Sequence, residues 1–222
     1  MKEVQNIIKA SEIAQATYID IAADTNIIFL ASQFTHLPLC ISSIIPDQIY
    51  KCVDIGIEIV EIGNFDAYYN KGMIFNVKDI KNLSRTIRRR LPNIHLCVTL
   101  PYIISIKEQI ELAKYLEFIG VNSIQIEGNI NHRYDRLNQR LPLNRYNSTL
   151  INTYSLSRIV NIPIIAASGL NLSSAYIAQS YGASCIGIKT AIIQETTLNK
   201  KIDMIKKIKS TLKDTTTRSY IL

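Results

Sequence analysis

The sequence has no tryptophan, only 8 glycines in 222 residues, and no CxxC pair among its 4 cysteines. Three of the four, Cys40, Cys97 and Cys185, lie in short apolar runs that are typical of strands. Isolated cysteines in such runs are usually buried thiols rather than metal ligands or disulfide partners. We therefore expect reduced cysteines in the core of a protein that works in a reducing compartment.

Long apolar runs are also missing. The sequence has no run of 18 apolar residues and no apolar segment behind a basic N-terminus, so it indicates neither a membrane span nor a secretory signal. No GxGxxG follows the first predicted strand, which removes the usual dinucleotide-binding signature. We expect a soluble protein with no membrane partner and no cofactor.

Histidine is rare and scattered. The three histidines, His36, His95 and His132, stand far apart, and His95 falls near the N-terminal end of a predicted strand. This spacing predicts no metal-binding triad. Because no Ser/His or Cys/His pair lies at strand ends, the sequence also disfavours a nucleophile triad.

The net charge is +7, and the clearest runs of cations lie on predicted helices. Arg88 to Arg90 end one predicted helix, and a lysine run lies along another. Cations suit the last turn of a helix or a solvated helix face, so the pattern disfavours nucleic acid as a partner. The lysine run consists of Lys200, Lys201, Lys206, Lys207 and Lys209.

Short β-branched runs alternate with amphipathic segments along the chain. The predicted strands are 17–22, 37–42, 57–62, 94–99, 122–127, 162–167 and 183–188. The predicted helices are 2–16, 25–34, 46–55, 76–90, 106–118, 149–160, 171–181 and 197–213. Asn76 caps the fourth of these helices, with Asp79 completing a capping-box-like pair. The alternation predicts one domain, residues 1–222, built on a parallel sheet.

Two stretches near the C-terminus indicate what kind of sheet this is. Pro163–Leu170 (PIIAASGL) and Gly182–Ile192 (GASCIGIKTAI) each resemble a buried strand that ends in small residues where a helix begins. Tandem loops of this kind follow strands seven and eight of phosphate-binding (β/α)8 barrels. Seven strands and eight helices, starting with a helix, predict a TIM-type barrel that lacks its first strand. An open doubly wound sheet is the alternative.

Several segments resemble the hypothetical chloroplast open reading frame twenty-three family of algal plastids and cyanobacteria. The segments are TYIDIAAD (17–24), LCISSI (39–44), VEIGNFDAYY (60–69), VTLPY (98–102), IQIEG (124–128) and IIAASGLN (164–171). The resemblance implies a TIM-barrel fold and a plastid location, and it assigns no catalytic residue. Relatives in this family carry a strand and loop ahead of the helix that begins here. We therefore expect the strands 17–22 and 183–188 to have unpaired edges.

The tail loops predict a phosphate site. Ser168 and Gly169, with Leu170 before the helix cap Asn171, provide backbone N–H groups and little side-chain bulk. The second loop is less typical, because Lys189 and Thr190 stand where a glycine-rich turn would be expected; they could supply a charge and a hydroxyl. Tight helix packing by the small residues is the alternative.

Polar residues at strand ends form the predicted catalytic group. Asp20, Glu61 and Glu127 lie in or after apolar strands, where a carboxylate is expensive unless it has partners, so we expect them to converge. They could transfer protons, with Lys189 holding some of them ionised or acting as a Schiff-base nucleophile. A buried charge network of Lys189 with Glu127 and Glu61 is the alternative. Other residues predicted at the barrel mouth are Asp24, Asn64, Asp66, Thr99 and Gln125.

Two long loops, 63–75 and 128–148, follow strands and so belong at the mouth, where long loops often act as lids. The second contains Arg133, Arg136, Arg140 and Arg145, which would need to form one basic face to bind nucleic acid.

The sequence thus predicts a barrel that binds a small phosphorylated molecule. If it is an enzyme, lyase, isomerase or aldolase-type chemistry is expected. The alternative is a non-catalytic regulatory or ligand-sensing protein. The oligomeric state stays open.

Overall fold

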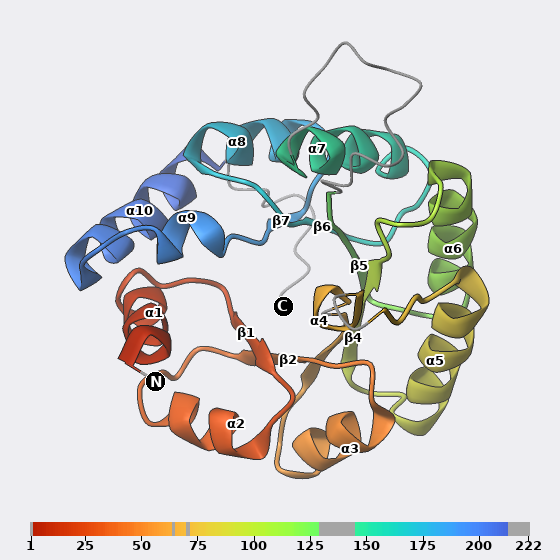
Figure 1. Cartoon of the computed structure of the whole chain (residues 1–222), viewed down its shortest axis with the longest axis horizontal. Coiled ribbons are helices and arrows are strands. Elements are labelled where there is room, and N and C mark those ends of the chain that lie inside the picture. Colours follow the sequence, from red (N-terminus) through yellow and green to blue (C-terminus); the bar gives the residue numbers. More distant parts are fainter. Residues whose placement is uncertain (1, 64, 70–71, 129–144, 213–222) are drawn as a thin grey trace.

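A computed structural model describes residues 2–63, 65–69, 72–128 and 145–212. Its seven strands form one parallel sheet in the order β1-β2-β3-β4-β5-β6-β7, and the sheet curls into an open barrel with helices around the outside (Figure 1). The chain is therefore an α/β protein of the (β/α)8 type with seven strands, as the sequence predicts.

The elements follow one another in strand–helix alternation. The strands are β1 (Ile19–Ala22), β2 (Leu39–Ser42), β3 (Ile59–Ile62), β4 (His95–Leu100), β5 (Ser123–Ile126), β6 (Ile164–Ala166) and β7 (Cys185–Ile186). The helices are α1 (Lys2–Ile13), α2 (Thr25–Ser32), α3 (Pro46–Asp54), α4 (Asp66–Tyr69), α5 (Val77–Arg90), α6 (Ile106–Phe118), α7 (Arg145–Leu156), α8 (Leu172–Ser180), α9 (Thr190–Ile193) and α10 (Leu198–Thr211).

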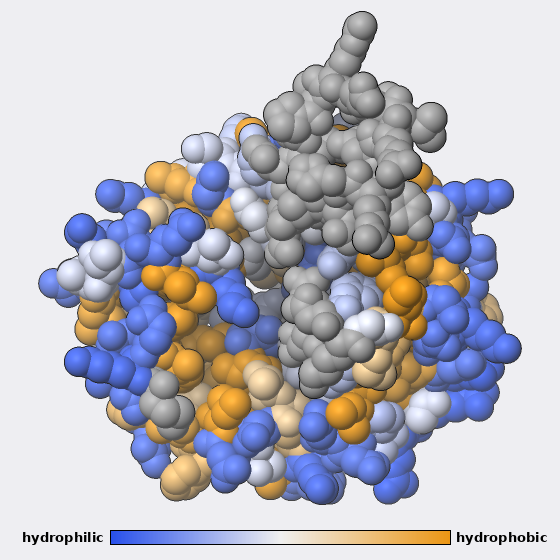
Figure 2. All heavy atoms as spheres, in the orientation of Figure 1, coloured by the Kyte–Doolittle hydropathy of each residue, from blue (hydrophilic) through white to orange (hydrophobic). Residues whose placement is uncertain are grey.

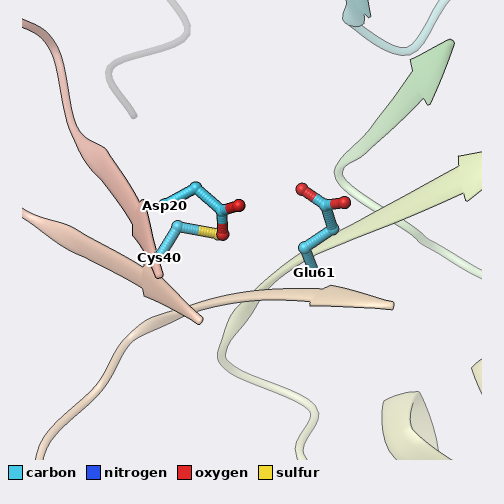
Figure 3. A group of neighbouring side chains, drawn as sticks. All are labelled: Asp20, Cys40 and Glu61. Carbon is cyan, nitrogen blue, oxygen red and sulfur yellow. The ribbon is translucent and has the colours of Figure 1, made fainter. Parts of the chain in front are cut away.

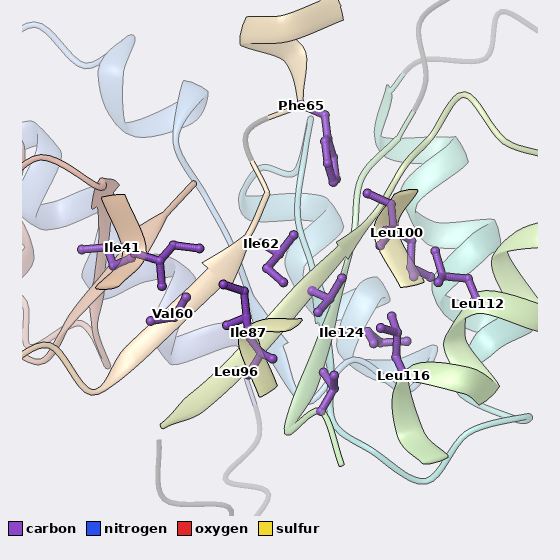
Figure 4. Packing of buried hydrophobic residues seen from close by; sticks show 14 of the residues in the cluster. Ile41, Val60, Ile62, Phe65, Ile87, Leu96, Leu100, Leu112, Leu116 and Ile124 are labelled. Carbon is purple, nitrogen blue, oxygen red and sulfur yellow. The ribbon is translucent and has the colours of Figure 1, made fainter. Parts of the chain in front are cut away.

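The main apolar core lies between the sheet and the helices, whereas hydrophilic residues cover much of the molecular face seen in Figure 2. Every second residue of the strands points outward, and on β3 these are Val60 and Ile62, both fully buried. They pack with helix residues such as Ile87 and Leu112 (Figure 4). Strands that are covered by helices have nearly continuous apolar sequences, which is why all seven could be predicted from the sequence.

Helix starts follow local capping chemistry. The side chain of Asn76 accepts from the backbone N–H of Asp79, and Asp79 accepts in return from the N–H of Asn76. Ser105 and Glu108 form the same reciprocal pair at the start of α6. The predicted capping box is confirmed, because it depends only on residues three apart.

The sheet is open between β1 and β7, but the helices next to this opening, α1 and α10, contact each other. Within the described residues β1 pairs only with β2, and β7 only with β6, so the predicted edges at both strands are confirmed. Helices α1 and α10 nevertheless pack directly on each other through Ala10 and Ile202. The Lys209 ammonium also donates to the carbonyls of Ala14 and Gln15 beyond the end of α1.

Besides shifts in the bounds of several elements, the structure differs from the sequence prediction in its short helices and in the contacts of two lysines. It adds two one-turn helices, α4 and α9, to the eight predicted ones. It also places Lys201 and Lys209 in contacts with other helices, whereas we expected a solvated lysine face. Lys201 is 2% exposed and donates to the carbonyls of Ile192, Ile193 and Glu195 at the end of α9. A helix C-terminus is a favourable place for a cation. The ammonium of Lys201, a residue of α10, lies at the C-terminus of the neighbouring helix α9.

No helix in the described part of the chain is both long and apolar enough to cross a membrane.

Candidate ligand site at the barrel mouth

Many side chains on the inward face of the sheet are polar, whereas those on the outward face are apolar. Asp20, Cys40, Glu61, Thr99 and Gln125 alternate along their strands with outward-facing Ile, Val or Leu residues. The parallel register places Asp20 opposite Cys40 and Thr99 opposite Gln125. Barrels of this type usually fill their interior with bulky branched side chains. An interior of carboxyl, thiol, hydroxyl and amide groups is therefore unusual and indicates a site.

Glu61 is the most buried carboxyl of this group. It is 4% exposed, and its Oε1 accepts hydrogen bonds from Thr99 Oγ1 (2.7 Å) and Gln125 Nε2 (2.9 Å). Burial raises its pKa well above the ordinary value, and the nearby charges of Asp20 and Glu127 raise it further, against the hydrogen bond from Thr99. A group in this environment favours a proton or a cation over a bare negative charge.

The backbone next to Glu61 leaves room for its carboxyl. A Cβ on Gly63 would overlap Oε1 of Glu61 and would lie 2.8 Å from Oγ1 of Thr99. Only glycine lets the chain turn into the following loop this close to the carboxyl. Gly63 therefore belongs to the site through its missing side chain.

Asp20 and Cys40 lie side by side and face Glu61 across the interior (Figure 3). One carboxylate oxygen of each acid and the sulfur of Cys40 all lie within 4.8 Å of one another. Asp20 accepts a hydrogen bond from Ser42 Oγ at its Oδ1. Although solvent reaches Asp20, protein atoms surround it on most sides; this burial raises its pKa to about 6, against the hydrogen bonds from Ser42 and Cys40 and the charge of Lys189.

Cys40 is a site residue that sequence reasoning missed. It lies in an apolar run, LPLCIS, where a core thiol was expected, and it is indeed buried and free. Burial, followed by the charges of Asp20 and Glu61, raises its thiol pKa well above the ordinary value. Its position two residues before Ser42, on the same face of β2, was the one available signal; the register with Asp20 could not be read from the sequence.

The first tail loop has a strained backbone. Ser168 and the following Gly169 both have left-handed backbones, with φ of 76° and 74°, which is uncommon for a serine. Thr149 Oγ1 donates to the carbonyls of Ala167 and Ser168 and holds this turn from the side of α7. Within the described part of the chain, no residue accepts from the backbone N–H groups of Gly169 and Leu170.

The second tail loop contains an unpredicted helix. Lys189 is exposed and occupies the N-cap position of α9, followed by the exposed Thr190. The loop approaches the first one closely at Gly187, where a Cβ would lie 3.0 Å from that of Ala167. The buried ammonium of Lys201 holds the other end of α9. A short helix after the last strand is a recurrent part of phosphate sites in barrels.

The remaining residues predicted at the barrel mouth lie at different places in the fold. Asp24 caps α2, with its carboxylate accepting from Asn26 N at 2.8 Å. Glu127 directly follows β5 and is half-buried; its charge acts on Glu61. Asn64 lies outside the described residues, as do the side chain of Asp66 and the basic face predicted for Arg133, Arg136, Arg140 and Arg145.

The predicted alternative, a charge network of Lys189 with Glu127 and Glu61, stays a prediction for Glu127, and among the described residues Glu61 has other hydrogen-bond partners. The hydrogen bonds to Glu61 come from Thr99 and Gln125, and the Lys189 charge acts on Asp20 instead. His95 lies at the start of β4, away from the mouth as expected, with Nε2 3.1 Å from Ser123 Oγ. Among the described residues, the group with metal-ligand spacing is Asp20, Cys40 and Glu61.

Fold and site together define an α/β-barrel protein whose polar groups gather inside and at the C-terminal ends of its strands. The chain belongs to the family described as protein of unknown function DUF561, whose model matches residues 1–219. Proteins named uncharacterized protein ycf23 are similar to it. The one from Pyropia yezoensis is 40% identical over 212 residues, covering 96% of this chain and 78% of the relative. The one from Cyanophora paradoxa is 37% identical over 206 residues, covering 92% and 84%.

Solved structures of low sequence identity share the fold. An aldolase called QR15 superimposes with a TM-score of 0.65 at 15% identity, covering 91% of this chain and 89% of its own. Thiamine phosphate pyrophosphorylase from Pyrococcus furiosus gives 0.60 at 16% identity, covering 96% and 90%. At this identity the likeness establishes the barrel architecture.

Proposed function

We propose that this chain is a plastid protein, folded as a single domain, that binds a small phosphorylated metabolite at the mouth of its barrel. The observation that carries the proposal is the pairing of two loops after β6 and β7. One provides the backbone N–H groups of Gly169 and Leu170, which have no acceptor among the described residues, next to the strained Ser168. The other provides the ammonium of Lys189 and the hydroxyl of Thr190 at the start of α9. The plastid location rests on the ycf23 relatives of red algae and a glaucophyte.

The two loops would divide the recognition of a phosphate. Amides at a helix start donate to phosphate oxygens, and a lysine adds charge without demanding one geometry. Lys201 donates hydrogen bonds at the C-terminal end of α9, and Gly187, ahead of α9, lies close to Ala167 of the first loop. The carbon skeleton of the ligand would then extend toward Asp20 and Glu61.

The carboxyl groups would transfer protons in lyase, isomerase or aldol-type chemistry. Asp20 is reached by solvent and Glu61 is buried, so their environments differ, as expected of an acid and a base that act as a pair. Glu127 acts on Glu61 through its charge, and Thr99 and Gln125 orient the Glu61 carboxyl. The thiamine-phosphate enzyme and the aldolase of the same fold provide support by analogy only.

Calorimetric titration with inorganic phosphate tests the binding step. We expect Lys189→Met to weaken phosphate binding about tenfold, which corresponds to about 1.4 kcal/mol. Lys200→Met is the matched control, because Lys200 is also exposed and lies outside both loops. Equal affinities for the native protein and Lys189→Met would refute the phosphate site.

A screen of phosphorylated metabolites then separates the enzyme from the alternative, a ligand-sensing barrel. For an enzyme, Glu61→Gln abolishes turnover and leaves phosphate affinity near the native value. Binding without turnover of any compound by the native protein would favour the sensor.

A further inference from the structure

We propose that Asp20, Cys40 and Glu61 form a binding site for a divalent transition-metal ion, with zinc as the best-suited occupant. The three side chains come from the adjacent strands β1, β2 and β3, and one ligand atom from each lies within 4.8 Å of the others. The site shares the interior with the proposed phosphate-binding mouth, but it uses none of the loop residues that would bind phosphate.

The backbone fixes the relative positions of the three ligands. Asp20 and Cys40 are register partners across β1 and β2. Glu61 is the register partner of Ser42, two residues beyond Cys40 on the same face. Ligands of one zinc ion lie about 3.5 Å apart, given zinc–sulfur and zinc–oxygen distances of about 2.3 and 2.0 Å. A shift of about an ångström among the three side chains would close the group around an ion.

A second observation points to an occupant. Thr99 and Gln125 both donate to Oε1 of Glu61, and in the described part of the chain no residue donates to Oε2. This oxygen belongs to a side chain that is 4% exposed and directed toward Asp20 and Cys40 in Figure 3. A carboxylate oxygen that is withdrawn from water, and that lacks a protein donor, is a position for a proton or a cation.

The donor set selects the class of ion. A thiolate with two carboxylates is too soft a set for magnesium or calcium, and it suits zinc and its neighbours in the first transition series. Three protein ligands leave a fourth position free, and solvent reaches the group at Asp20. Ser42, Thr99 and Gln125 hydrogen-bond to the carboxylates, as surrounding residues do in established metal centres.

Binding would exchange protons for the ion. The Cys40 thiol gives its proton to solvent when sulfur coordinates the metal, and any proton held by the carboxyl pair leaves in the same way. The charge of Lys189 acts on Asp20 and opposes a second cation, but this lysine is exposed and free to turn toward solvent.

Titration of the chelator-treated protein with Co²⁺ under reducing conditions tests the site. We expect saturation at one equivalent, with a thiolate-to-cobalt charge-transfer band in the near ultraviolet. Zn²⁺ should bleach the band and Mg²⁺ should not. Cys40→Ser should abolish the band, whereas Cys52→Ser and Cys97→Ser, which alter two other buried thiols, should keep it. A band that survives in Cys40→Ser, or the absence of any saturable band, would overturn the proposal.

Two further variants keep the test decisive if Cys40→Ser folds poorly. Asp20→Asn keeps the size of the side chain and should weaken Co²⁺ binding about 100-fold, because losing a ligand costs at least as much as losing one of the residues that support the ligands. Lys189→Met should tighten Co²⁺ binding and weaken phosphate binding. The two proposals therefore fail separately: the cobalt band does not depend on phosphate affinity, and unchanged phosphate affinity in Lys189→Met leaves the band in place.

Discussion

The two faces of the same sheet have opposite chemistry. On β3, Ile62 points outward into the apolar core, and its chain neighbour Glu61 points inward among polar groups. The outward face contacts helices along most of the sheet, so burial of apolar area there supplies most of the fold's stability. The inward face contributes hydrogen bonds, and its carboxyl groups are held at the expense of desolvation. The fold is thus stabilised on one side of the strands and equipped for ligands on the other.

Removing outward-facing volume should have the largest effect. Ile62→Ala deletes buried methyl and methylene groups between β3 and the helices and should lower the free energy of unfolding by about 3 kcal/mol. Urea denaturation monitored by circular dichroism measures this loss. A loss below about 1 kcal/mol would place the stabilising core elsewhere.

Crowding the inward face should have an intermediate effect. Gly63→Ala forces a Cβ onto Oε1 of Glu61 and should cost about 2 kcal/mol through displacement of the carboxyl. A double-mutant cycle with Glu61→Ala is the control, because removal of the carboxyl should relieve most of the cost. An undiminished cost in the Glu61→Ala background would mean that strain arises in the backbone and not at the carboxyl.

His95, at the start of β4 and so at the opposite end of the barrel, should have a smaller and pH-dependent effect on the free energy of unfolding. Burial lowers the pKa of His95 to about 4, from 6.5 in the unfolded chain, and the charge of Arg88 acts in the same direction. The unfolded state therefore binds the proton more readily. The contribution of neutral His95 is present above about pH 6.5 and is lost as the pH falls toward 4.

His95→Gln should remove this part of the acid sensitivity. Compared with the native protein, the variant should lose about 1 kcal/mol less stability between pH 7 and pH 4, after allowance for solvent screening. Denaturation curves at several pH values measure the difference. Identical pH profiles would show that folding does not lower the pKa of His95.

Much of the fold could be predicted from local patterns. The seven strands were located because apolar runs four to six residues long alternate with amphipathic helices, and α6 was predicted with the bounds observed. The last strand was predicted as 183–188 and is only Cys185–Ile186, the two residues that pair with β6. Helices α4 and α9 were missed, since four residues show no helical period.

The candidate site could be predicted only in part. Strand parity brought Asp20, Glu61, Thr99 and Gln125 to one face, because alternation is a local property. Cys40 required the register between β1 and β2, and the contacts of Lys201 required the packing of α10 on α9. Both depend on contacts between different elements, and no periodicity in the sequence encodes them.

The free energy of unfolding of Glu61→Gln, measured beside that of Ile62→Ala, tests most directly whether the two faces have different roles. Gln keeps an oxygen that can accept from Thr99 and Gln125 and removes a buried acidic group. We predict that Glu61→Gln stays within about 1 kcal/mol of the native protein, while Ile62→Ala loses about 3 kcal/mol. A loss in Glu61→Gln as large as that in Ile62→Ala would contradict the division, because the inward carboxyl would then be holding the fold together.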